Sequence, residues 1–288
     1  MKLSINTDVL AKEHGEKKAI DMICDAGFDA LDFSFFDSKY HSDNLSDEFF
    51  RELRKYIEQK GLVVNQAHAP FPSSSREESK NDGIFKSIIT SIKNAALLGS
   101  PNIVVHPCTH MDHEADDNAE KLFEINMEFY KRLIPYCEEY GIKVALENMW
   151  QKSSYETDVI MPSTCARAEE FIKYFDTLNN DCFTICLDIG HAVLVRESPD
   201  ILIKKLGAKR LGCLHVHDVD AIHDLHTLPF FGEVKWDRVT KALADIGYNG
   251  DFTFEANNFY SKIPTAIWPS ALKHMEATGR YLITEIKK

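Results

Sequence analysis

One pattern recurs along the whole chain: an amphipathic segment with helical spacing, then a glycine or polar turn, then a short apolar run. Seven runs follow it, "AGFDALDFSF", "KGLVVNQAHAP", "LGSPNIVVHP", "YGIKVALEN", "NNDCFTICLDIGH", "LGAKRLGCLHVHD" and "IGYNGDFTFEAN", and "KLSINT" at the start makes eight. Six glycines lie where a helix C-terminus favours the left-handed conformation: Gly27, Gly61, Gly99, Gly141, Gly207 and Gly247. Strands that alternate with helices predict parallel βαβ units joined by right-handed crossovers.

The segments between the runs carry apolar residues at helical spacing. This spacing predicts helices over residues 47–60, 84–98 and 117–139. We expect Asp47 to cap the first of these helices, and Pro135 to kink or end the last turn of the third. The runs "NIVVH", "KVAL" and "FTICL" are continuously apolar, which is typical of parallel strands covered on both faces.

The length of the chain favours one of two α/β architectures. The chain has 288 residues, and a (β/α)8 barrel typically has about 250. We therefore predict a single (β/α)8 TIM barrel, with residues 1–288 forming one domain. A doubly wound open sheet is the alternative, but the sequence contains neither a GxGxxG nor a GxxxxGKS/T phosphate loop to support it.

Composition limits the location and the partners of the chain. The chain has seven cysteines and no CxxC pair, which is typical of reduced thiols in a cytoplasmic protein. We expect Cys182 and Cys186 to be buried thiols rather than a disulfide or a metal-binding pair. The N-terminus lacks the apolar region of a signal peptide, and no apolar stretch approaches the ~20 residues that span a bilayer. The net charge of −12, without a lysine or arginine cluster, argues against nucleic acid as a partner.

Several apolar runs end in residues that can bind a metal or transfer a proton. These residues are His68, His106, Glu147, Asp188, His191, His215, His217 and Glu255. In a barrel the C-terminal ends of all strands lie on one face, where active sites are found, so these residues would converge. Asp and Glu are almost never fully buried without a partner, and a divalent cation would neutralise several of them together. The pattern therefore predicts a metal site at this face.

The segment "HVHDVDAIHDLH", residues 215–226, is rich in histidine and aspartate. Four of its residues are expected in a solvated strand end and loop: His217, Asp218, Asp220 and His223. Asp224 and His226 belong either to that loop or to a metal site. A lone histidine at a strand end, such as His68 or His106, is more often a hydrogen-bonded polar residue than a ligand. Five other histidines are assigned to loops or helices without chemistry: His14, His41, His110, His113 and His274.

Four motifs carry a resemblance to a known family. The stretches "ALENM", "CLDIGH", "LHVHD" followed by "DLHTLPFFGEVKWDRV", and "GDFTFEA" resemble the xylose isomerase-like barrel superfamily, which contains sugar and sugar-phosphate isomerases and epimerases and also endonuclease IV-type enzymes. In the isomerase and epimerase branches the resemblance implies one divalent ion held by Glu147, Asp188, His215 and Glu255. The family spaces the ligand histidine three residues before an aspartate, here Asp218, and this selects His215 rather than His217.

The endonuclease branch implies further metal ligands. They fall on His68, His106, His191, Asp224 and His226. The family often has Gly-Glu-Gly soon after the Asp-x-His pair, whereas this chain has "TLPFF" before "GEV". Val234 in place of the glycine indicates a different loop conformation. Asp224 and His226 are therefore carried only as candidate additional ligands.

The resemblance implies a divalent-metal-dependent sugar isomerase or epimerase that acts on a small carbohydrate. A Mn, Mg or Co ion, or Zn if the additional histidines bind, would chelate the substrate and stabilise an enediolate. Glu147 and Glu255 are the candidate acid and base. Candidate substrate-binding residues are His68, His106, His191 and Trp150, and Phe259 and Tyr260 belong either to an apolar wall or to the core.

Three other functions stay open. An endonuclease IV-like multi-zinc phosphodiesterase would use the full set of histidines, but the net charge argues against DNA. A metal-dependent lyase or deglycosylase acting on an oxidised glycoside would use the same enolisation. A non-catalytic metal-stabilised subunit would not need two facing glutamates. The lack of an obvious phosphate loop favours an unphosphorylated substrate, and a homo-oligomer is compatible with each of these functions.

Overall fold

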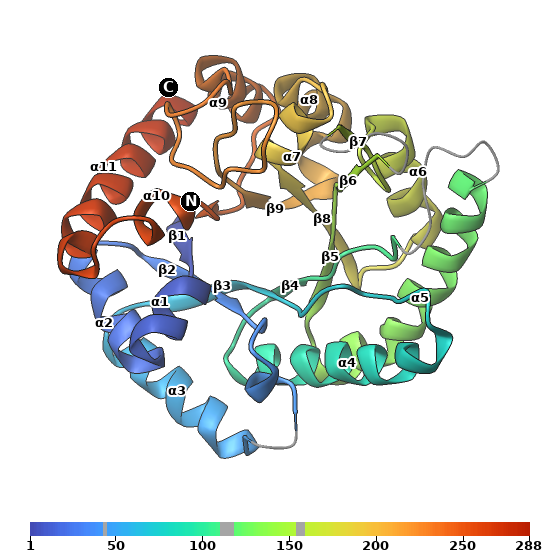
Figure 1. Ribbon diagram of the computed structural model, residues 1–288, viewed down its shortest axis with the longest axis horizontal. Helices are drawn as coiled ribbons and strands as arrows, with labels where there is room; N and C mark the ends of the chain where they lie inside the picture. Colours follow the sequence, from blue (N-terminus) through green and yellow to red (C-terminus); the bar gives the residue numbers. More distant parts are fainter. Residues whose placement is uncertain (43–44, 110–117, 154–158) are drawn as a thin grey trace.

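Eight parallel strands form the barrel at the centre of the computed structural model (Figure 1), which describes residues 1–42, 45–109, 118–153 and 159–288. The strands are β1 (Leu3–Asn6), β2 (Ala30–Ser34), β3 (Val63–His68), β4 (Asn102–Val104), β5 (Lys143–Glu147), β8 (Phe183–Asp188), β9 (Leu211–His215) and β10 (Phe252–Phe254). Their spatial order is β10-β1-β2-β3-β4-β5-β8-β9, so each strand lies beside its neighbour in the sequence. This order confirms the predicted (β/α)8 barrel and excludes a doubly wound sheet.

The barrel closes between its last two strands. Val216, which follows β9, and Phe254 of β10 form an isolated parallel bridge. The Val216 N–H donates to the carbonyl of Thr253 at 2.9 Å, and the Glu255 N–H donates to the carbonyl of Val216 at 3.1 Å. This closure brings the ends of β9 and β10 together.

A ring of helices surrounds the barrel (Figure 1). The longer helices are α2 (Glu16–Ala26), α3 (Asp47–Gln59), α4 (Asn81–Leu97), α5 (Asn118–Tyr140), α6 (Ala168–Leu178), α8 (Pro199–Arg210), α9 (Trp236–Asp245) and α11 (Trp268–Ile286). The shorter elements are α1 (Asp8–His14), α7 (Ile189–Leu194), α10 (Asn258–Ser261), η1 (Ser38–Tyr40), η2 (Glu78–Lys80), η3 (Thr265–Ile267) and the antiparallel pair β6 (Trp150–Lys152) and β7 (Ile160–Pro162). Among the described residues, no helix has the length and apolar character that crossing a membrane requires.

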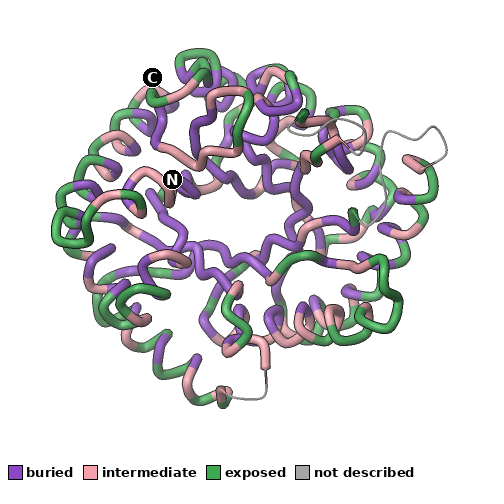
Figure 2. The backbone as a smooth tube through the Cα atoms, viewed as in Figure 1, coloured by how far each residue is buried: buried purple, intermediate pink, exposed green. Residues whose placement is uncertain are grey.

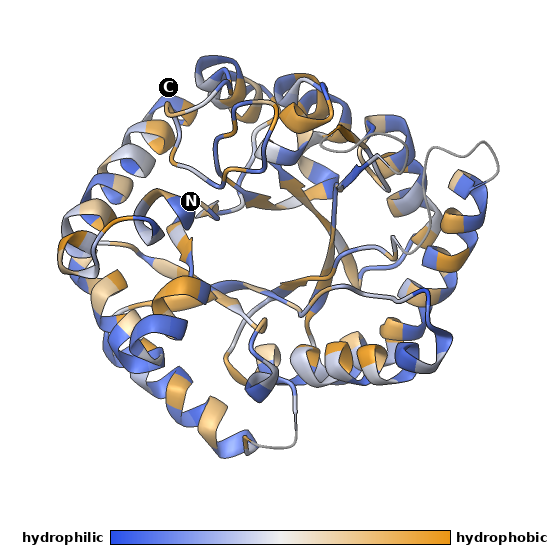
Figure 3. Cartoon of the chain, viewed as in Figure 1, coloured by the Kyte–Doolittle hydropathy of each residue, from blue (hydrophilic) through white to orange (hydrophobic). Residues whose placement is uncertain are grey.

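The main hydrophobic core fills the layer between the strands and the helices. The barrel strands are mostly buried, whereas the helices are buried mainly on their inner faces (Figure 2). In α4 the buried stripe includes Ile88, Ile92 and Ala95, which are spaced by one turn. Hydrophobic residues follow the same inner faces (Figure 3), so the hydrophobic pattern of the sequence accounts for the position of the helix ring.

Two details of the predicted helices differ in the structure. Ser46, and not Asp47, caps α3, because the Ser46 backbone is extended and its Oγ accepts from the Phe49 N–H at 3.4 Å. Pro135 does not end α5, which continues to Tyr140. A proline in a helix removes one backbone donor, and the buried residues on either side of Pro135, Leu133 and Cys137, keep the helix on the core.

The six glycines predicted to end helices all have positive φ, between +64° and +101°. Five of them follow a helix, whereas Gly207 lies inside α8, where it interrupts the helical geometry. At Gly27, which follows α2, the N–H bonds to the last turn of the helix in the left-handed cap geometry. Inside the barrel, Val104, Ala145, Cys186 and Cys213 form a separate small apolar cluster. All seven cysteines are free thiols; Cys186 is buried as expected, but Cys182, which precedes β8, is only partly buried.

Candidate metal and substrate site

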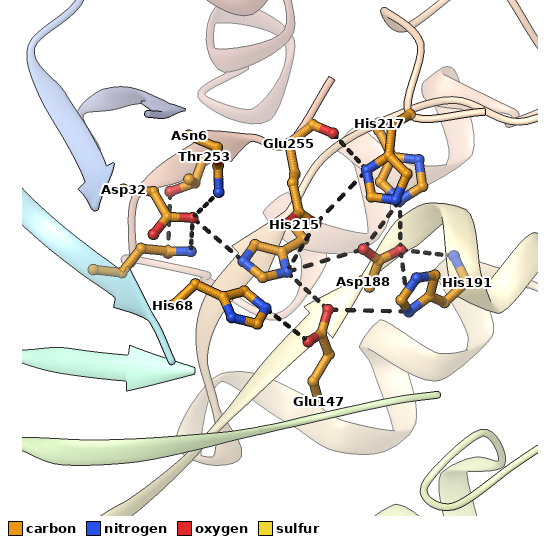
Figure 4. A network of polar contacts seen from close by, with 12 residues as sticks. Asn6, Asp32, His68, Glu147, Asp188, His191, His215, His217, Thr253 and Glu255 are labelled. Carbon is orange, nitrogen blue, oxygen red and sulfur yellow. Dashed lines mark hydrogen bonds and ion pairs between the residues drawn. The ribbon is translucent and has the colours of Figure 1, made fainter. Parts of the chain in front are cut away.

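Four side chains converge at the C-terminal ends of consecutive strands. Glu147, Asp188 and His215 are the last residues of β5, β8 and β9, and Glu255 follows β10 directly. One ligand atom from each lies within 4.8 Å of all the others, and the four residues are 0–7% exposed. Figure 4 shows them pointing toward one another. We call this set the four-ligand group.

The Nδ1 atom of His215 lies at the centre of the four-ligand group. It is 2.8 Å from Glu147 Oε1, 3.3 Å from Glu255 Oε2 and 4.0 Å from Asp188 Oδ2. Three carboxylates around one imidazole, buried in the barrel, repel one another unless a positive charge lies between them. Carboxylate oxygens and imidazole nitrogen are also the ligands that Mn, Co and Zn accept. The donor set therefore fits a divalent cation.

The pKa values of these groups reflect the same need for positive charge. Burial alone would raise the pKa of Glu147, but the neighbouring His215 and His106 hold it well below its usual value. Burial would likewise raise the pKa of Asp188, which His191 and His217 lower. Burial opposes protonation of His215, but the surrounding anionic groups, among them Glu255 and Glu147, raise its pKa well above the ordinary value. Positive charge at this point, from a protonated imidazole or from a cation, therefore stabilises the carboxylates.

Two further histidines share the second oxygen of Glu147. The Nε2 atom of His106 lies 2.9 Å from Glu147 Oε2, and the Nε2 atom of His68 lies 3.6 Å from the same oxygen. These three residues form a second group with metal-like spacing. Burial lowers the pKa of His106; for His68 burial also opposes protonation, but Glu147 raises the pKa above its ordinary value. The carboxylate of Glu147 thus bridges two groups of candidate ligands.

A third group consists of His191, His217, Asp224 and His226. Asp224 Oδ2 lies 3.1 Å from His226 Nε2 and 3.7 Å from His191 Nε2. Burial alone would lower the pKa of His226, but Asp224 raises it to about 9. The structure therefore brings the two candidate additional ligands, Asp224 and His226, into the site despite the altered loop sequence.

Backbone carbonyls fix the ring orientation of three histidines. The Nδ1 atoms of His68, His191 and His226 lie 2.8, 2.9 and 2.8 Å from the carbonyls of Ala69, Asn148 and Glu255. A carbonyl can only accept, so each Nδ1 is the donor and each Nε2 is directed toward the carboxylates. An imidazole held in this way at one nitrogen is typical of a metal-ligating histidine.

The prediction that His217 and Asp218 lie in a solvated strand end is wrong. Both residues are fully buried. The Nε2 atom of His217 lies 3.0 Å from each oxygen of Asp188. Residues two apart on a strand share a face, so the inward direction of His215 already indicates the same direction for His217. Asp220 and His223 do form the expected surface pair, in which Asp220 Oδ2 lies 2.9 Å from His223 Nδ1.

Asp218 organises the loop that follows β9. Its carboxylate accepts from the backbone N–H groups of Val219, Phe230 and Val234 and from Trp236 Nε1, at 2.8 to 3.0 Å. The Val234 N–H therefore has a buried partner in this loop, although the family often has glycine at that position. This network holds the loop that carries Asp224 and His226.

A cavity of about 430 Å³ opens onto the candidate ligands. Its lining includes His68, His106, Glu147, His191, Asp224, His226 and Glu255. Trp150 lines it too, and Trp150 Nε1 donates to Asp224 Oδ2 at 3.2 Å. The apolar wall of the cavity is formed by Phe36, Phe71, Met149 and Trp150.

Two aromatic residues proposed for that wall lie elsewhere. Tyr260 is fully buried and packs against Trp268, and Phe259 packs against Phe231, so neither lines the cavity. Asp8 was not predicted as a site residue, but it lies just beyond β1 and lines the cavity. Its position after a strand end is the same signal that identified Glu255. His110 and His113 lie outside the described residues.

Comparison with known proteins identifies the family. A model of the xylose isomerase-like TIM barrel family matches residues 20–278, so the chain belongs to this family. The chain is 24% identical to a D-psicose 3-epimerase of Enterocloster bolteae over 249 residues, which cover 83% of this chain and 76% of that protein. It is 25% identical to a probable endonuclease 4 of Lysinibacillus sphaericus over 202 residues, which cover 64% of this chain and 63% of that protein.

A solved structure shares the fold over the full length. The crystal structure of a D-tagatose 3-epimerase-like protein matches this chain with a TM-score of 0.77 at 21% sequence identity. The match covers 100% of this chain and 98% of that chain. At this level of identity the likeness establishes the shared barrel.

Proposed function

We propose that this protein is a divalent-metal-dependent isomerase or epimerase that acts on a small keto sugar. The observation that carries the proposal is the position of Glu147 and Glu255 on two sides of His215 Nδ1, within the four-ligand group and in the lining of the cavity. Relatives described as sugar 3-epimerases support the reaction class.

The proposed chemistry moves a proton between the two faces of one substrate carbon. A divalent ion at the four-ligand group would supply Lewis-acid polarisation of the substrate carbonyl, which acidifies the neighbouring C–H bond. Glu255, at the cavity wall, accepts the proton from one face of that carbon, and Glu147, after taking up a proton from solvent, donates it to the other face, or the reverse. The proton on the accepting glutamate then returns to solvent, which resets the pair. Burial would raise the pKa of Glu147, but the nearby imidazoles hold this pKa well below its ordinary value, so Glu147 starts as a carboxylate at neutral pH.

Other residues of the cavity would bind and orient the sugar. The Nε2 atoms of His68, His106 and His191 are directed into the site and are suited to hydrogen bonds with sugar hydroxyls. Trp150 supplies an apolar surface for one face of the sugar ring. In this proposal His68, His106 and His191 bind the substrate, and only the four-ligand group binds the ion.

The proposed substrate carries no phosphate. Four carboxylates line the cavity, those of Asp8, Glu147, Asp224 and Glu255, and these groups would repel an anionic substituent. Carboxylates accept hydrogen bonds from hydroxyl groups, and Phe36, Phe71 and Trp150 fit the C–H faces of a sugar. The lining therefore favours an uncharged polyol chain or ring over a phosphate ester.

The ion that best suits the four-ligand group is Mn, Mg or Co, because carboxylates dominate the donor set. The seven free thiols favour a cytoplasmic location. The proposed function is tested by incubating the metal-loaded protein with a panel of ketohexoses and following the appearance of epimers by chromatography. Chelation should abolish product formation and metal addition should restore it. Failure of every ketose to change, with the metal bound, would contradict the proposal.

A multi-zinc phosphodiesterase is the second candidate function. The specific observation in its favour is that the candidate ligands fall into four groups of metal-like spacing. Glu147 is shared between two of them, and the fourth group joins His68 to His215 and Glu255. The relative described as a probable endonuclease 4 supports it as well. Metal stoichiometry separates the two candidates: the epimerase requires one tightly bound ion, and the phosphodiesterase requires two or three zinc ions.

A further inference from the structure

A buried carboxylate lies behind the four-ligand group, on the side away from the cavity. Asp32, on β2, is fully buried and does not line the cavity. Its Oδ2 atom lies 3.5 Å from the Nε2 atom of His215, the ring nitrogen opposite the one that faces Glu147 and Glu255 (Figure 4). His215 therefore lies between carboxylates that face both of its ring nitrogens, and among the described residues its Nε2 atom has no hydrogen-bond partner closer than Asp32.

Neighbouring strands supply two donors to the same oxygen of Asp32. Asn6 on β1 and Gln66 on β3 are the register partners of Asp32 in the sheet. Asn6 Nδ2 donates to Asp32 Oδ2 at 3.3 Å, and Gln66 Nε2 donates to it at 3.4 Å. Three nitrogens from three different strands, including His215 Nε2, thus converge on one carboxylate oxygen.

The orientation of both amides is fixed by further hydrogen bonds. Asn6 Oδ1 accepts from Ser34 Oγ at 2.8 Å and from Asn257 Nδ2 at 3.1 Å, so its amino group must face Asp32. Gln66 Oε1 accepts from Thr253 Oγ1 at 3.1 Å, which directs its amino group to Asp32 as well. Both amides donate to Asp32 Oδ2, so this oxygen is an acceptor. It therefore also faces His215 Nε2 as an acceptor.

We infer that Asp32 is a positioning residue that holds His215 with its proton on Nε2, so that the Nδ1 lone pair is directed at the metal. Asp32 acts through His215 and touches neither substrate nor ion. A carboxylate behind a metal-ligating imidazole fixes its tautomer and ring orientation and increases its basicity, and loss of such a partner typically weakens metal binding about 10- to 100-fold. The inference rests on the metal site of the proposed function and not on the sugar reaction.

The first test measures metal affinity by calorimetry, without any turnover. Asp32→Asn keeps the size of the side chain and removes its charge, and we expect Mn(II) to bind about 10- to 100-fold more weakly. Asp25→Asn is the matched control, since Asp25 is exposed on α2; it should bind Mn(II) like the wild type. Wild-type affinity in Asp32→Asn would overturn the inference, whatever the protein does to sugars.

The second test needs no variant of Asp32 and therefore stands even if that variant does not fold. Protein labelled with ¹⁵N-histidine and loaded with diamagnetic Zn(II) is studied by NMR, with the His215 signals assigned by their loss in His215→Gln. The ¹⁵N shifts and long-range couplings should identify Nε2 as the protonated nitrogen and Nδ1 as the metal-bound one. A metal-bound Nε2, or a proton on Nδ1, would overturn the inference.

Discussion

The Nε2 atom of His217 lies 3.0 Å from both carboxylate oxygens of Asp188. Asp188 belongs to the four-ligand group and His217 to the third group, so this contact joins the two. Gly190 makes the contact possible: a Cβ atom at position 190 would lie 2.0 Å from His217 Cε1. The first turn of α7 thus has to pass the imidazole without a side chain.

Gly190→Ala should displace His217 from Asp188 and weaken the metal site. The added methyl group meets a ring that is itself fully buried, and overpacking of this kind costs about 1–3 kcal/mol. Gly83→Ala on α4 is the control, because a Cβ there meets nothing within 4 Å, and alanine at a helical position is neutral to stabilising. Denaturant unfolding and metal titration of both variants provide the measurement. Equal stability and equal metal affinity in the two variants would contradict this account of Gly190.

The four-ligand group should hold one tightly bound divalent ion. Asp188→Asn and His215→Ala should each weaken metal binding by more than about 100-fold, since loss of an outer-shell partner alone is worth about 10- to 100-fold. His223→Ala removes an imidazole from the same segment, but its side chain is 69% exposed, so metal content should not change. Elemental analysis after dialysis measures the metal content of the wild type and of these three variants. Full metal occupancy in both Asp188→Asn and His215→Ala would show that the four-ligand group is not the metal site.

The protein should not cleave DNA. Its net charge is −12, and binding of a polyphosphate backbone depends on cationic side chains that displace counterions. The measurement is incubation of zinc-loaded and manganese-loaded protein with a duplex containing an abasic site, at physiological salt. Efficient metal-dependent cleavage would refute the prediction. It would also assign His68, His106, His191, Asp224 and His226 as zinc ligands.

Free ketoses should be used in preference to their phosphate esters. Asp8 contributes to the carboxylate lining of the cavity. Asp8→Asn removes this charge and should lower the ratio of kcat/KM for the free ketose to kcat/KM for its phosphate ester about fivefold. This factor corresponds to about 1 kcal/mol of like-charge repulsion. Glu13→Gln, an exposed charge on the same helix, should leave the ratio unchanged. The ratio of kcat/KM for a ketohexose and its 6-phosphate is the quantity to compare. A higher ratio for the phosphate in the wild type would contradict the prediction.

The barrel could be predicted from the sequence because every repeat carries its own signals. Three strands contain continuously apolar runs, the helices predicted over 47–60, 84–98 and 117–139 each have one apolar stripe, and five glycines at positive φ follow the ends of helices. The N-cap of α3 could not be predicted in the same way, because Ser46 and Asp47 are both suitable capping residues. Ser46 is the cap because its backbone is extended, whereas Asp47 is the first residue of the helix. Proline has low helix propensity, but the buried packing of α5 around Pro135 outweighs this propensity.

The candidate site was only partly predictable. Strand ends identify which residues reach the barrel mouth, and the structure brings together all the candidate ligands, including Asp224 and His226. The burial of His217 and Asp218 could not be inferred from their polarity, because it depends on the loop that folds over β9 and donates hydrogen bonds to Asp218. The roles of Asp32, Asn6 and Gln66 depend on cross-strand register, which no local pattern specifies.

The proposal that Glu147 and Glu255 move a carbon-bound proton next to a carbonyl that the ion would polarise is tested most directly by hydrogen exchange. Metal-loaded protein is incubated with a ketose substrate in heavy water, and deuterium at the substrate carbon is followed by NMR. Glu255→Gln should lose exchange by about 10²- to 10⁴-fold, the usual contribution of a general acid or base. Metal occupancy is measured in parallel, and Glu13→Gln serves as the matched control. We expect deuterium exchange at the substrate carbon in the wild type and its loss in Glu255→Gln with the metal still bound. Wild-type exchange in that variant, or turnover with neither solvent exchange nor proton transfer between substrate carbons, would contradict it.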